Sequence, residues 1–340
     1  MLPNFSRRTL LGGLGAVSLG GMVACAGDDD ASPGLSELTY QLSWLHSVQF
    51  GGTYLAKDRG IFEELGLDVQ LAPGGPNVAG DANTVSGSSL MNISVADNIA
   101  RANAEGADLV IIGAQYQKSP PTILSLADAP LTVPEDMVGK KIGVASANVP
   151  MLSAFLGING IDEAAVEFVP SQYDPAILTS GQVDGLYCFY NDLPVSLAVQ
   201  GIEGATLLLA DFDYNPMSQT YAVLRSSLED EATRDQIVRL VRGDARGWQR
   251  YREDPEAAAE LTVEMYPDAG LDIEAQRIQA EIQLDIMFSD TTDTHGFAWF
   301  TDEQIQENLA LFEVLGVEGG TEAMWDRSIL EEVYSDGPTA

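Results

Sequence analysis

The chain alternates short apolar runs with longer amphipathic runs over its first two thirds, and this alternation most limits its fold. Extended runs are predicted at 38–42, 67–71, 90–95, 109–114, 141–145, 166–169 and 185–189. Helical patterns separate them at 52–64, 96–105, 149–157 and from 175 to 180. Gly66 closes the first helix, as a C-terminal glycine does. Strand–helix–strand repetition predicts α/β sheets with helices on both faces.

After an apolar run at 221–224, the sequence becomes mostly helical. Helices are predicted at 228–252, 255–265, 271–287, 301–315 and 321–333. Pro255 and Pro267 separate the first three, because proline interrupts a helix interior. The chain is therefore expected to end in a helical C-terminal tail.

The first residues carry an export signal. Arg7 and Arg8 precede a glycine-rich, mildly apolar run that reaches Ala24, so residues 1–24 are predicted to be a twin-arginine-type signal peptide. The small residue before Cys25 resembles a lipoprotein cleavage box, and Cys25 is predicted to be lipidated. Met22 and Val23 depart from that box, which leaves an ordinary signal with a chance cysteine as the alternative.

Residues 25–36 are polar and turn-rich, and they are predicted to form a flexible tether. The run before Cys25 is too short and too glycine-rich for a good membrane span. We therefore expect an extracytoplasmic protein that contacts the membrane only through a lipid anchor.

The charge balance limits the partners. The chain has 51 acidic and 17 basic residues, for a net charge of −34, and such a surface repels nucleic acid and anionic lipid. A hydrophobic content of 45% still favours a globular protein with a large core. With Cys25 lipidated, Cys188 has no disulfide partner, and the distant His46 and His295 form no metal motif. No metal and no cofactor are expected.

Two turn-rich segments divide the chain into lobes. Residues 130–136 are predicted to be a first crossing between lobes, and residues 211–216 the return. One lobe would comprise 37–126 plus 218–335, and the other 127–217. No short-period internal repeat is present.

Several motifs then carry a family resemblance. Trp44 ends the first strand, a glycine–aromatic–x–alanine helix start follows at 52–56, and residues 60–69 read Gly-Ile-Phe-Glu-Glu-Leu-Gly-Leu-Asp-Val. This stretch resembles the opening of the NMT1/THI5-like periplasmic solute-binding proteins, relatives of sulfonate- and nitrate-binding proteins. Further similar segments lie at 73–77, 139–144, 181–185 and 194–201, so the resemblance spans 38–250.

The resemblance implies a periplasmic-binding-protein-like fold with two lobes, two crossings and a small-molecule ligand in the cleft. It also implies that the closed form docks on the permease of an ABC importer. Family members include binders of thiamine-precursor pyrimidines and of riboflavin, which makes a small heteroaromatic nutrient the expected ligand. A sulfonate- or nitrate-type anion is the alternative ligand of the same fold.

Two other classes of function are weighed against a transport role. The THI5 branch includes a pyrimidine synthase with a run of cysteines and a key histidine. The matching residues 217–221 contain no cysteine here, so no enzyme activity is expected. A sensory or adhesion module with the same fold is a further alternative, because fold alone does not define function.

The candidate ligand residues follow the predicted strands, since ligands of open α/β sheets bind outside the carboxyl ends of strands. They are Trp44, His46, Gln49, Asn77, Asp97, Gln115, Tyr116, Ser146, Asn148, Tyr187, Tyr190 and Asn191. Asp192 and Trp299 are secondary candidates. Trp44 could instead be a core residue, His46 a solvated loop residue, and Ser146 and Asn148 helix caps.

The chemistry of this set favours a flat ring. Aromatic side chains offer stacking faces, and amides offer directional hydrogen bonds. The set contains no arginine or lysine, which a sulfonate or nitrate site would favour, although helix N-termini remain a possible source of donors.

Overall fold

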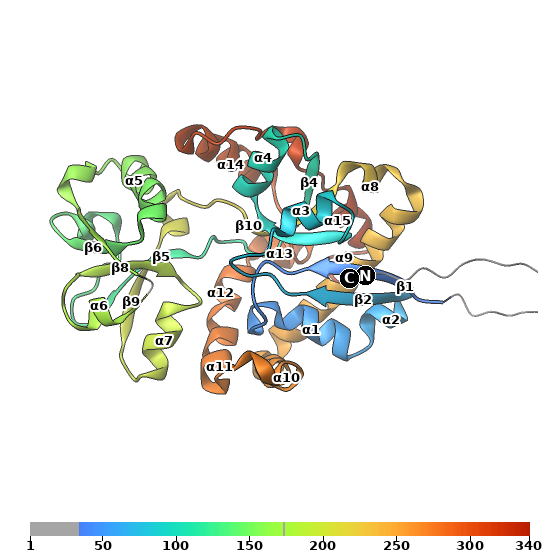
Figure 1. Cartoon of the computed structure of the whole chain (residues 1–340), viewed down its shortest axis with the longest axis horizontal. Helices are drawn as coiled ribbons and strands as arrows, with labels where there is room; N and C mark the ends of the chain where they lie inside the picture. Colours follow the sequence, from blue (N-terminus) through green and yellow to red (C-terminus); the bar gives the residue numbers. More distant parts are fainter. Residues whose placement is uncertain (1–33, 173) are drawn as a thin grey trace, which may run out of the picture. The chain divides into compact units, whose positions relative to one another are not determined.

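Two five-stranded sheets organise the chain (Figure 1). The structure, a computed structural model, describes residues 34–172 and 174–340. The predicted signal peptide, Cys25 and most of the predicted tether lie outside the described residues. Residues from Leu35 to Ala340 form one compact unit, and the predicted α/β class is confirmed.

The first sheet contains four parallel strands and one antiparallel strand. Its strands, in spatial order, are β2 (Leu67–Ala72), β1 (Ser36–Gln41), β3 (Met91–Val95), β10 (Ser218–Leu224) and β4 (Leu109–Ala114). β1 pairs in parallel with β2 and β3, whereas β10 pairs antiparallel with β3 and β4. We call this sheet and its helices lobe 1.

The second sheet repeats the same plan. Its strands, in spatial order, are β7 (Glu167–Pro170), β6 (Lys141–Val144), β8 (Gly185–Phe189), β5 (Pro121–Leu126) and β9 (Gly204–Leu208). β6 pairs in parallel with β7 and β8, and β5 is the antiparallel strand. We call this sheet and its helices lobe 2.

Helices return the chain from the carboxyl end of one strand to the start of the next parallel strand. In lobe 1 they are α1 (Gly51–Asp58), α2 (Ile61–Glu64), α3 (Gly80–Val85) and α4 (Ala96–Ala104). In lobe 2 they are α5 (Val149–Ile158), α6 (Ala176–Thr179) and α7 (Leu193–Val199). The predicted helix 52–64 is divided because Gly60 adopts a left-handed conformation, with φ of 70°.

The helical tail covers lobe 1. It consists of α8 (Arg225–Glu229), α9 (Glu231–Glu253), α10 (Pro255–Met265), α11 (Ile273–Ile282), α12 (Leu284–Met287), α13 (Asp290–His295), α14 (Asp302–Leu315) and α15 (Ser328–Val333). A Cβ atom at Gly247 of α9 would lie 2.1 Å from the Gly52 carbonyl oxygen, so glycine is required where α9 crosses α1. Trp248, beside it, is fully buried in the core.

The structure corrects three predictions about the elements. The segment 321–333 is not one helix, because Trp325 forms a parallel bridge with Ile111 of β4 before α15 begins. The strands β5 and β9 and the helices α3, α7 and α13 were not predicted. The predicted helices 228–252 and 271–287 are each divided, at Asp230 and Gln283.

The first crossing also lies earlier than predicted. Residues 121–126 belong to the second sheet as β5, so the chain passes between the sheets before Pro121 rather than at 130–136. Leu131, in the predicted crossing, is buried in the lobe 2 core. The return segment lies between Phe212 and Ser218, and the first two residues of the predicted return, Asp211 and Phe212, belong to the 3₁₀ helix Leu209–Phe212.

The two crossing segments are joined by hydrogen bonds. The Ser119 backbone N–H donates to Asn215 Oδ1 at 2.7 Å, and the Ser119 and Ser218 hydroxyls lie 3.0 Å apart. Lys118 Nζ pairs with Asp211 Oδ1 at 2.6 Å. These contacts place the connections of both lobes side by side, as a paired hinge requires.

Candidate functional site

A pocket of about 650 Å³ runs between α3 and α4, from the carboxyl ends of β1 and β3 to the segment 105–107 that follows α4. Leu42, Ile93 and Val78 give it apolar walls, and Ser43 and Asn98 add polar groups. This position agrees with the rule that open α/β sheets bind ligands beyond the carboxyl ends of their strands. The volume is in the range of small-molecule sites.

A cluster of polar side chains adjoins this pocket through Ser43. The Ser43 hydroxyl donates to Gln219 Oε1 at 2.7 Å. Asn191 Nδ2, from the segment after β8, donates to the Tyr116 hydroxyl oxygen at 3.0 Å. Burial raises the pKa of Tyr116, and the amides of Gln219 and Asn191 oppose that rise. The cluster therefore joins residues from both lobes.

Gln219 is held in an unusual backbone conformation. Its φ is 50°, in the left-handed region, and the pairing of β10 with β3 shifts register between Ser218 and Thr220. A bulge of this kind re-aims a side chain, and left-handed non-glycine residues occur preferentially at functional sites. Here the bulge accompanies a Gln219 side chain that reaches Ser43 beyond the end of β1.

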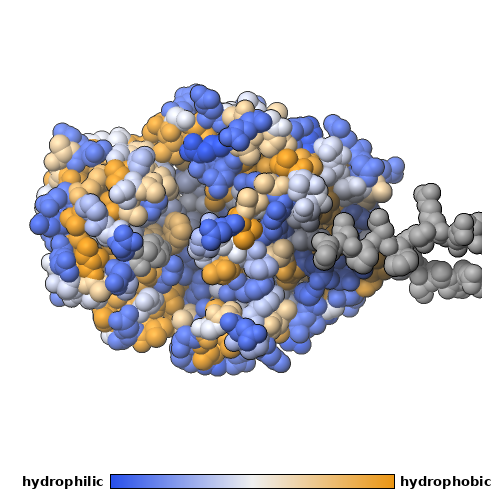
Figure 2. Space-filling view, in the orientation of Figure 1, coloured by the Kyte–Doolittle hydropathy of each residue, from blue (hydrophilic) through white to orange (hydrophobic). Residues whose placement is uncertain are grey.

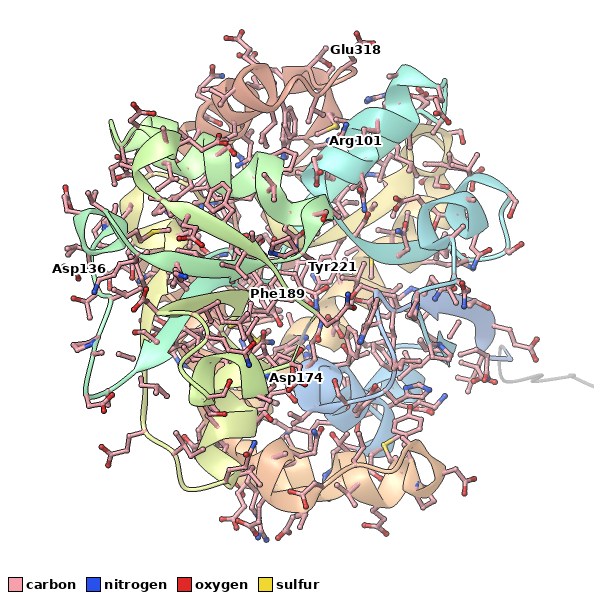
Figure 3. The ribbon with its side chains drawn as sticks, turned by 60° about the vertical axis from the view of Figure 1, so that its left-hand side comes forward. Arg101, Asp136, Asp174, Phe189, Tyr221 and Glu318 are labelled. Atoms are coloured by element: carbon pink, nitrogen blue, oxygen red, sulfur yellow. The ribbon has the colours of Figure 1, made fainter. Side chains whose placement is uncertain are left out.

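Two aromatic side chains are exposed at the carboxyl ends of strands. Trp44 follows β1 and is 47% exposed, so it is not a core residue. Phe189 ends β8 and is 44% exposed (Figure 3). Exposed aromatic rings at these positions offer faces on which a planar ligand can stack.

His46 belongs to a separate aromatic cluster. Its ring stacks on Tyr266 with centroids 3.6 Å apart, and its Nδ1 lies 3.0 Å from the Tyr54 hydroxyl. Burial lowers the pKa of His46, so the ring stays neutral near pH 7. These contacts make His46 a packed residue between the first loop and the tail, rather than a solvated loop residue.

Gln115 is buried in the core of lobe 1 beneath the polar cluster. Its Nε2 lies 3.3 Å from Asp244 Oδ2 and 3.2 Å from the Tyr221 hydroxyl. Asp244 also accepts hydrogen bonds from Tyr221 and from Thr53. Burial raises the pKa of Asp244 to about 6, although these hydrogen bonds oppose the shift.

Two further tyrosines predicted for the site lie in lobe 2 or at its border. Tyr187 is buried in β8, and its hydroxyl has no hydrogen-bond partner. Tyr190 donates to Asp285 Oδ2 of α12 at 3.2 Å, which joins lobe 2 to the tail. Burial raises the pKa of Tyr190, and the nearby charge of Asp285 adds to the rise.

The remaining predicted residues lie apart from the polar cluster. Asn77 and Ser146 are exposed, whereas Gln49, Asp97 and Asn148 are half-buried. Asn148 is the N-cap of α5, but its side chain makes no capping hydrogen bond. Asp97 lies in the first turn of α4, 3.7 Å from Arg101. Of the twelve predicted residues, only Tyr116 and Asn191 contact each other through side-chain hydrogen bonds.

The secondary candidates lie elsewhere. Asp192 is the exposed N-cap of α7, and Trp299 stacks on His295 with centroids 4.9 Å apart. A second groove of about 300 Å³ runs between α7 and α11 and contains Asn191, Asp192 and Gln276. It extends the border between lobe 2 and the tail.

Sequence reasoning missed Ser43, Gln219 and Phe189. Ser43 and Phe189 could have been found, because Ser43 directly follows a predicted strand and Phe189 ends one. Gln219 could not, because its side-chain direction depends on a bulge in β10. That strand was predicted only from residue 221.

The described residues add three further facts. Residues 34–172 and 174–340 contain no group of three or more His, Cys, Asp or Glu side chains arranged to hold a metal ion. Within the same residues, no helix is long and apolar enough to cross a membrane. In Figure 2, hydrophilic residues are spread over the visible face, with apolar residues in small groups between them.

Comparison with known proteins gives relatives of two kinds. The riboflavin-binding protein RibY of Chloroflexus aurantiacus is 25% identical over 293 residues, covering 81% of this chain and 80% of RibY. The structure titled a putative sulfonate ABC transporter, periplasmic sulfonate-binding protein SsuA, from Methylobacillus flagellatus has a TM-score of 0.63 at 16% identity. That alignment covers 89% of this chain and 94% of the other.

An enzyme shares the fold as well. The desulfurization enzyme DSZB has a TM-score of 0.57 at 15% identity, with 88% of this chain and 98% of DSZB covered. At such identities, these structural similarities establish the fold alone, which is periplasmic-binding-protein-like. Residues 47–258 match the NMT1/THI5 like family. The resemblance seen in the sequence is thereby confirmed, and the chain belongs to the NMT1/THI5-like family.

Proposed function

We propose that the protein is an extracytoplasmic solute-binding protein that captures a small heteroaromatic nutrient and delivers it to an ABC importer. The ligand class is a thiamine-precursor pyrimidine or a riboflavin-like compound. The observation that carries the proposal is membership of the NMT1/THI5-like family together with similarity to a riboflavin-binding protein over 81% of the chain.

The chemistry of the site supports a planar ligand. Trp44 and Phe189 present exposed rings at the carboxyl ends of β1 and β8. Tyr116, Asn191 and Gln219 provide hydroxyl and amide groups for the polar edge of a heterocycle. Stacking on an aromatic side chain contributes on the order of 1 kcal/mol beyond the buried area.

The alternative ligand is an aliphatic sulfonate or nitrate, as the fold shared with SsuA suggests. An anion site needs strong donors, such as guanidinium groups or free helix N-termini. No arginine or lysine lines the pocket between α3 and α4. Lys118, on the first crossing, is already paired with Asp211.

We propose further that the protein is not an enzyme, although DSZB has the same fold. Cys188 is the described cysteine, and it is fully buried in β8. Burial raises the pKa of its thiol, which disfavours the nucleophilic thiolate. No cysteine lies at 217–221, where the related synthase would carry its cysteine run.

Delivery to a permease requires that the protein stays outside the membrane and close to it. We propose that residues 1–24 direct export by the twin-arginine route and that Cys25 is lipidated. Cys25→Ala should release the protein from the membrane fraction. If the variant stays membrane-associated, the lipid anchor at Cys25 is wrong.

A thermal-shift screen tests the ligand class. Binding to the native state raises the melting temperature with the logarithm of ligand concentration. Riboflavin or a thiamine-precursor pyrimidine should raise it, whereas an alkanesulfonate and nitrate should not at equal ionic strength. Stabilisation by the sulfonate alone would contradict the heteroaromatic ligand. An adjacent permease gene distinguishes transport from a sensory or adhesion role.

A further inference from the structure

The acidic pocket and the starts of the crossover helices point to a limit on the ligand's charge. We propose that the site takes the uncharged form of its ligand and rejects anionic forms, in particular phosphate monoesters. This inference rests on the proposed function, because it concerns the same site. It specifies that riboflavin or a pyrimidine alcohol binds, whereas the corresponding phosphate ester does not.

The pocket between α3 and α4 carries acidic groups without basic ones. Asp81 and Glu105 are its charged lining residues, and no lysine, arginine or histidine lines it. The groove between α7 and α11 repeats this pattern with Asp192 and Asp272. A phosphate group entering either space would meet charges of its own sign, which repel it.

Helix N-termini are the usual alternative source of anion binding, because their free N–H groups and dipole attract negative charge. In lobe 1, the second residue of α3 is Asp81 and the second residue of α4 is Asp97. A carboxylate in the first turn already satisfies the positive end of the helix dipole. Arg101, labelled in Figure 3, lies on the next turn of α4, 3.7 Å from Asp97.

In lobe 2, prolines at α5 and α7 and an acidic side chain at α6 weaken the helix N-termini as anion-binding sites. The second residue of α5 is Pro150 and the second residue of α7 is Pro194. Proline has no N–H, so each helix start has one donor fewer for an anion. At α6, the Ala176 N–H donates to Asp174 Oδ1 at 2.9 Å (Asp174 is labelled in Figure 3).

These starts occupy equivalent places in the two lobes. α3, α4, α5, α6 and α7 each begin after the carboxyl end of a parallel strand, on the side where ligands bind. The remaining crossover helices are α1 and α2. The first residues of α1, Gly51 and Gly52, are buried against Tyr251 and Trp248. α2 follows α1 at Gly60 and does not begin at a strand end. Each of the other five crossover helices, α3 to α7, therefore has an acidic residue or a proline in its first turn or just before it.

Calorimetry with riboflavin and riboflavin 5′-phosphate tests the inference. The wild type should bind riboflavin and should bind the phosphate at least about tenfold more weakly. The double variant Asp81→Asn with Glu105→Gln should narrow the ratio of riboflavin affinity to phosphate-ester affinity roughly threefold to tenfold, because the phosphate ester gains affinity when the like charges are removed. The ratio of riboflavin affinity to phosphate-ester affinity should also fall at high salt, because exposed charges are screened.

The matched control removes two charges at the opposite end of lobe 2. Asp128 and Glu203 are exposed beyond the carboxyl end of β5, and the Ala127 N–H bonds to the Glu203 carbonyl there. Asp128→Asn with Glu203→Gln should leave the ratio unchanged. Should the Asp81 variant fold poorly, Glu105→Gln alone provides the test, since the Glu105 side chain is exposed.

A second pair of variants tests the helix starts. One variant restores a backbone N–H donor, and the other is its control. Pro150→Ala returns an N–H to the first turn of α5 and should raise affinity for the phosphate ester roughly twofold to fivefold. Pro255→Ala, in the first turn of α10, should have no such effect. Equal binding of the two flavins by the wild type overturns the charge limit and leaves the ligand class intact.

Failure of the proposed ligand is a separate outcome. If neither flavin nor a pyrimidine binds, inorganic phosphate still tests the charge limit at constant ionic strength. The inference expects no saturable heat. Phosphate binding to the wild type with a Kd below about 1 mM would overturn it.

Discussion

The Asn191 amide donates a hydrogen bond to the Tyr116 hydroxyl at 3.0 Å, and it joins the end of β8 in lobe 2 to the segment that leaves β4 in lobe 1. Both side chains are buried, with 5% exposed. Because the two residues lie on either side of the first crossing, their contact depends on how the lobes meet.

Replacement of Asn191 by Ala should weaken ligand binding about fivefold, since a hydrogen bond of this kind contributes about 1 kcal/mol. Tyr116→Phe should have a similar effect. Calorimetry with the best ligand of the panel checks both variants.

Tyr334→Phe is the matched control for this pair. Its hydroxyl donates to the Phe297 carbonyl at 2.9 Å within lobe 1. The control should lower the melting temperature without changing ligand affinity. If Asn191→Ala and the wild type bind the ligand with equal affinity, the Tyr116–Asn191 contact does not contribute to ligand binding.

Trp44→Ala should reduce affinity for a planar ligand and leave the free energy of unfolding nearly unchanged. The side chain is 47% exposed, so little core packing is lost. Denaturant unfolding and ligand titration separate the two effects. A variant that binds normally but unfolds more easily would make Trp44 a packing residue.

Trp248→Ala gives the contrasting behaviour. Trp248 is fully buried and stacks on Phe297 with centroids 5.5 Å apart. Its loss should lower the free energy of unfolding by about 3–5 kcal/mol.

The sequence predicted most of the lobe 1 strands because each has an apolar run bounded by turn residues. It did not predict β5, because the proline-rich residues 130–134 indicated a crossing between the lobes, whereas the chain crosses before residue 121. β5 is the antiparallel strand of the second sheet, and its partners β8 and β9 lie more than sixty residues away along the chain. Because this pairing joins segments that are distant in the chain, no short stretch of the sequence indicates it.

The site was predicted only in outline for a similar reason. The strand-end rule located Tyr116 and Asn191, which are in contact. It also selected Gln115, whose amide is turned into the core toward Asp244. Successive side chains on an extended segment point to opposite sides, so the adjacent Gln115 and Tyr116 contact different partners, Asp244 and Asn191.

Gln219→Gly should weaken ligand binding and change the free energy of unfolding little, because two terms of similar size oppose each other. The left-handed φ of 50° costs a non-glycine residue on the order of 1 kcal/mol, which glycine avoids. The side-chain contact with Ser43 is lost at the same time. Chemical denaturation and calorimetry measure the two quantities.

Asp108→Gly is the comparison for that variant. Asp108 has φ of 54° and lies just before the amino end of β4, at the opposite edge of the first sheet from Ser43. It should leave ligand affinity unchanged. Tighter binding by Gln219→Gly would show that the side chain obstructs the site.

Asp244 should make the fold more stable as the pH falls from about 6 toward 4. Its pKa is raised by burial to about 6, above the value of 3.8 for an unperturbed aspartate. The folded state therefore binds a proton that the unfolded state lacks in this range, so stability falls as pH rises through it. The difference is on the order of 2–3 kcal/mol.

Asp244→Asn should remove this contribution. Unfolding free energies of wild type and variant, measured from pH 4 to pH 7, should diverge by the expected amount as the pH rises. Parallel profiles would mean that Asp244 has the same pKa in both states. Asp136, in the 3₁₀ helix Pro134–Met137, has a pKa lowered by hydrogen bonds from the Thr132 and Val133 N–H groups, so its contribution is lost as the pH falls below about 4. Asp136→Asn should therefore leave the slope between pH 4 and pH 7 nearly unchanged.

The most direct test of the account is calorimetric titration of the mature protein with riboflavin, a thiamine-precursor pyrimidine, an alkanesulfonate and nitrate under one set of conditions. The account predicts saturable binding of one neutral heteroaromatic compound, at one site per chain, and no binding of the two anions. Saturable binding of the sulfonate or nitrate, with no response to either heteroaromatic compound, would contradict it.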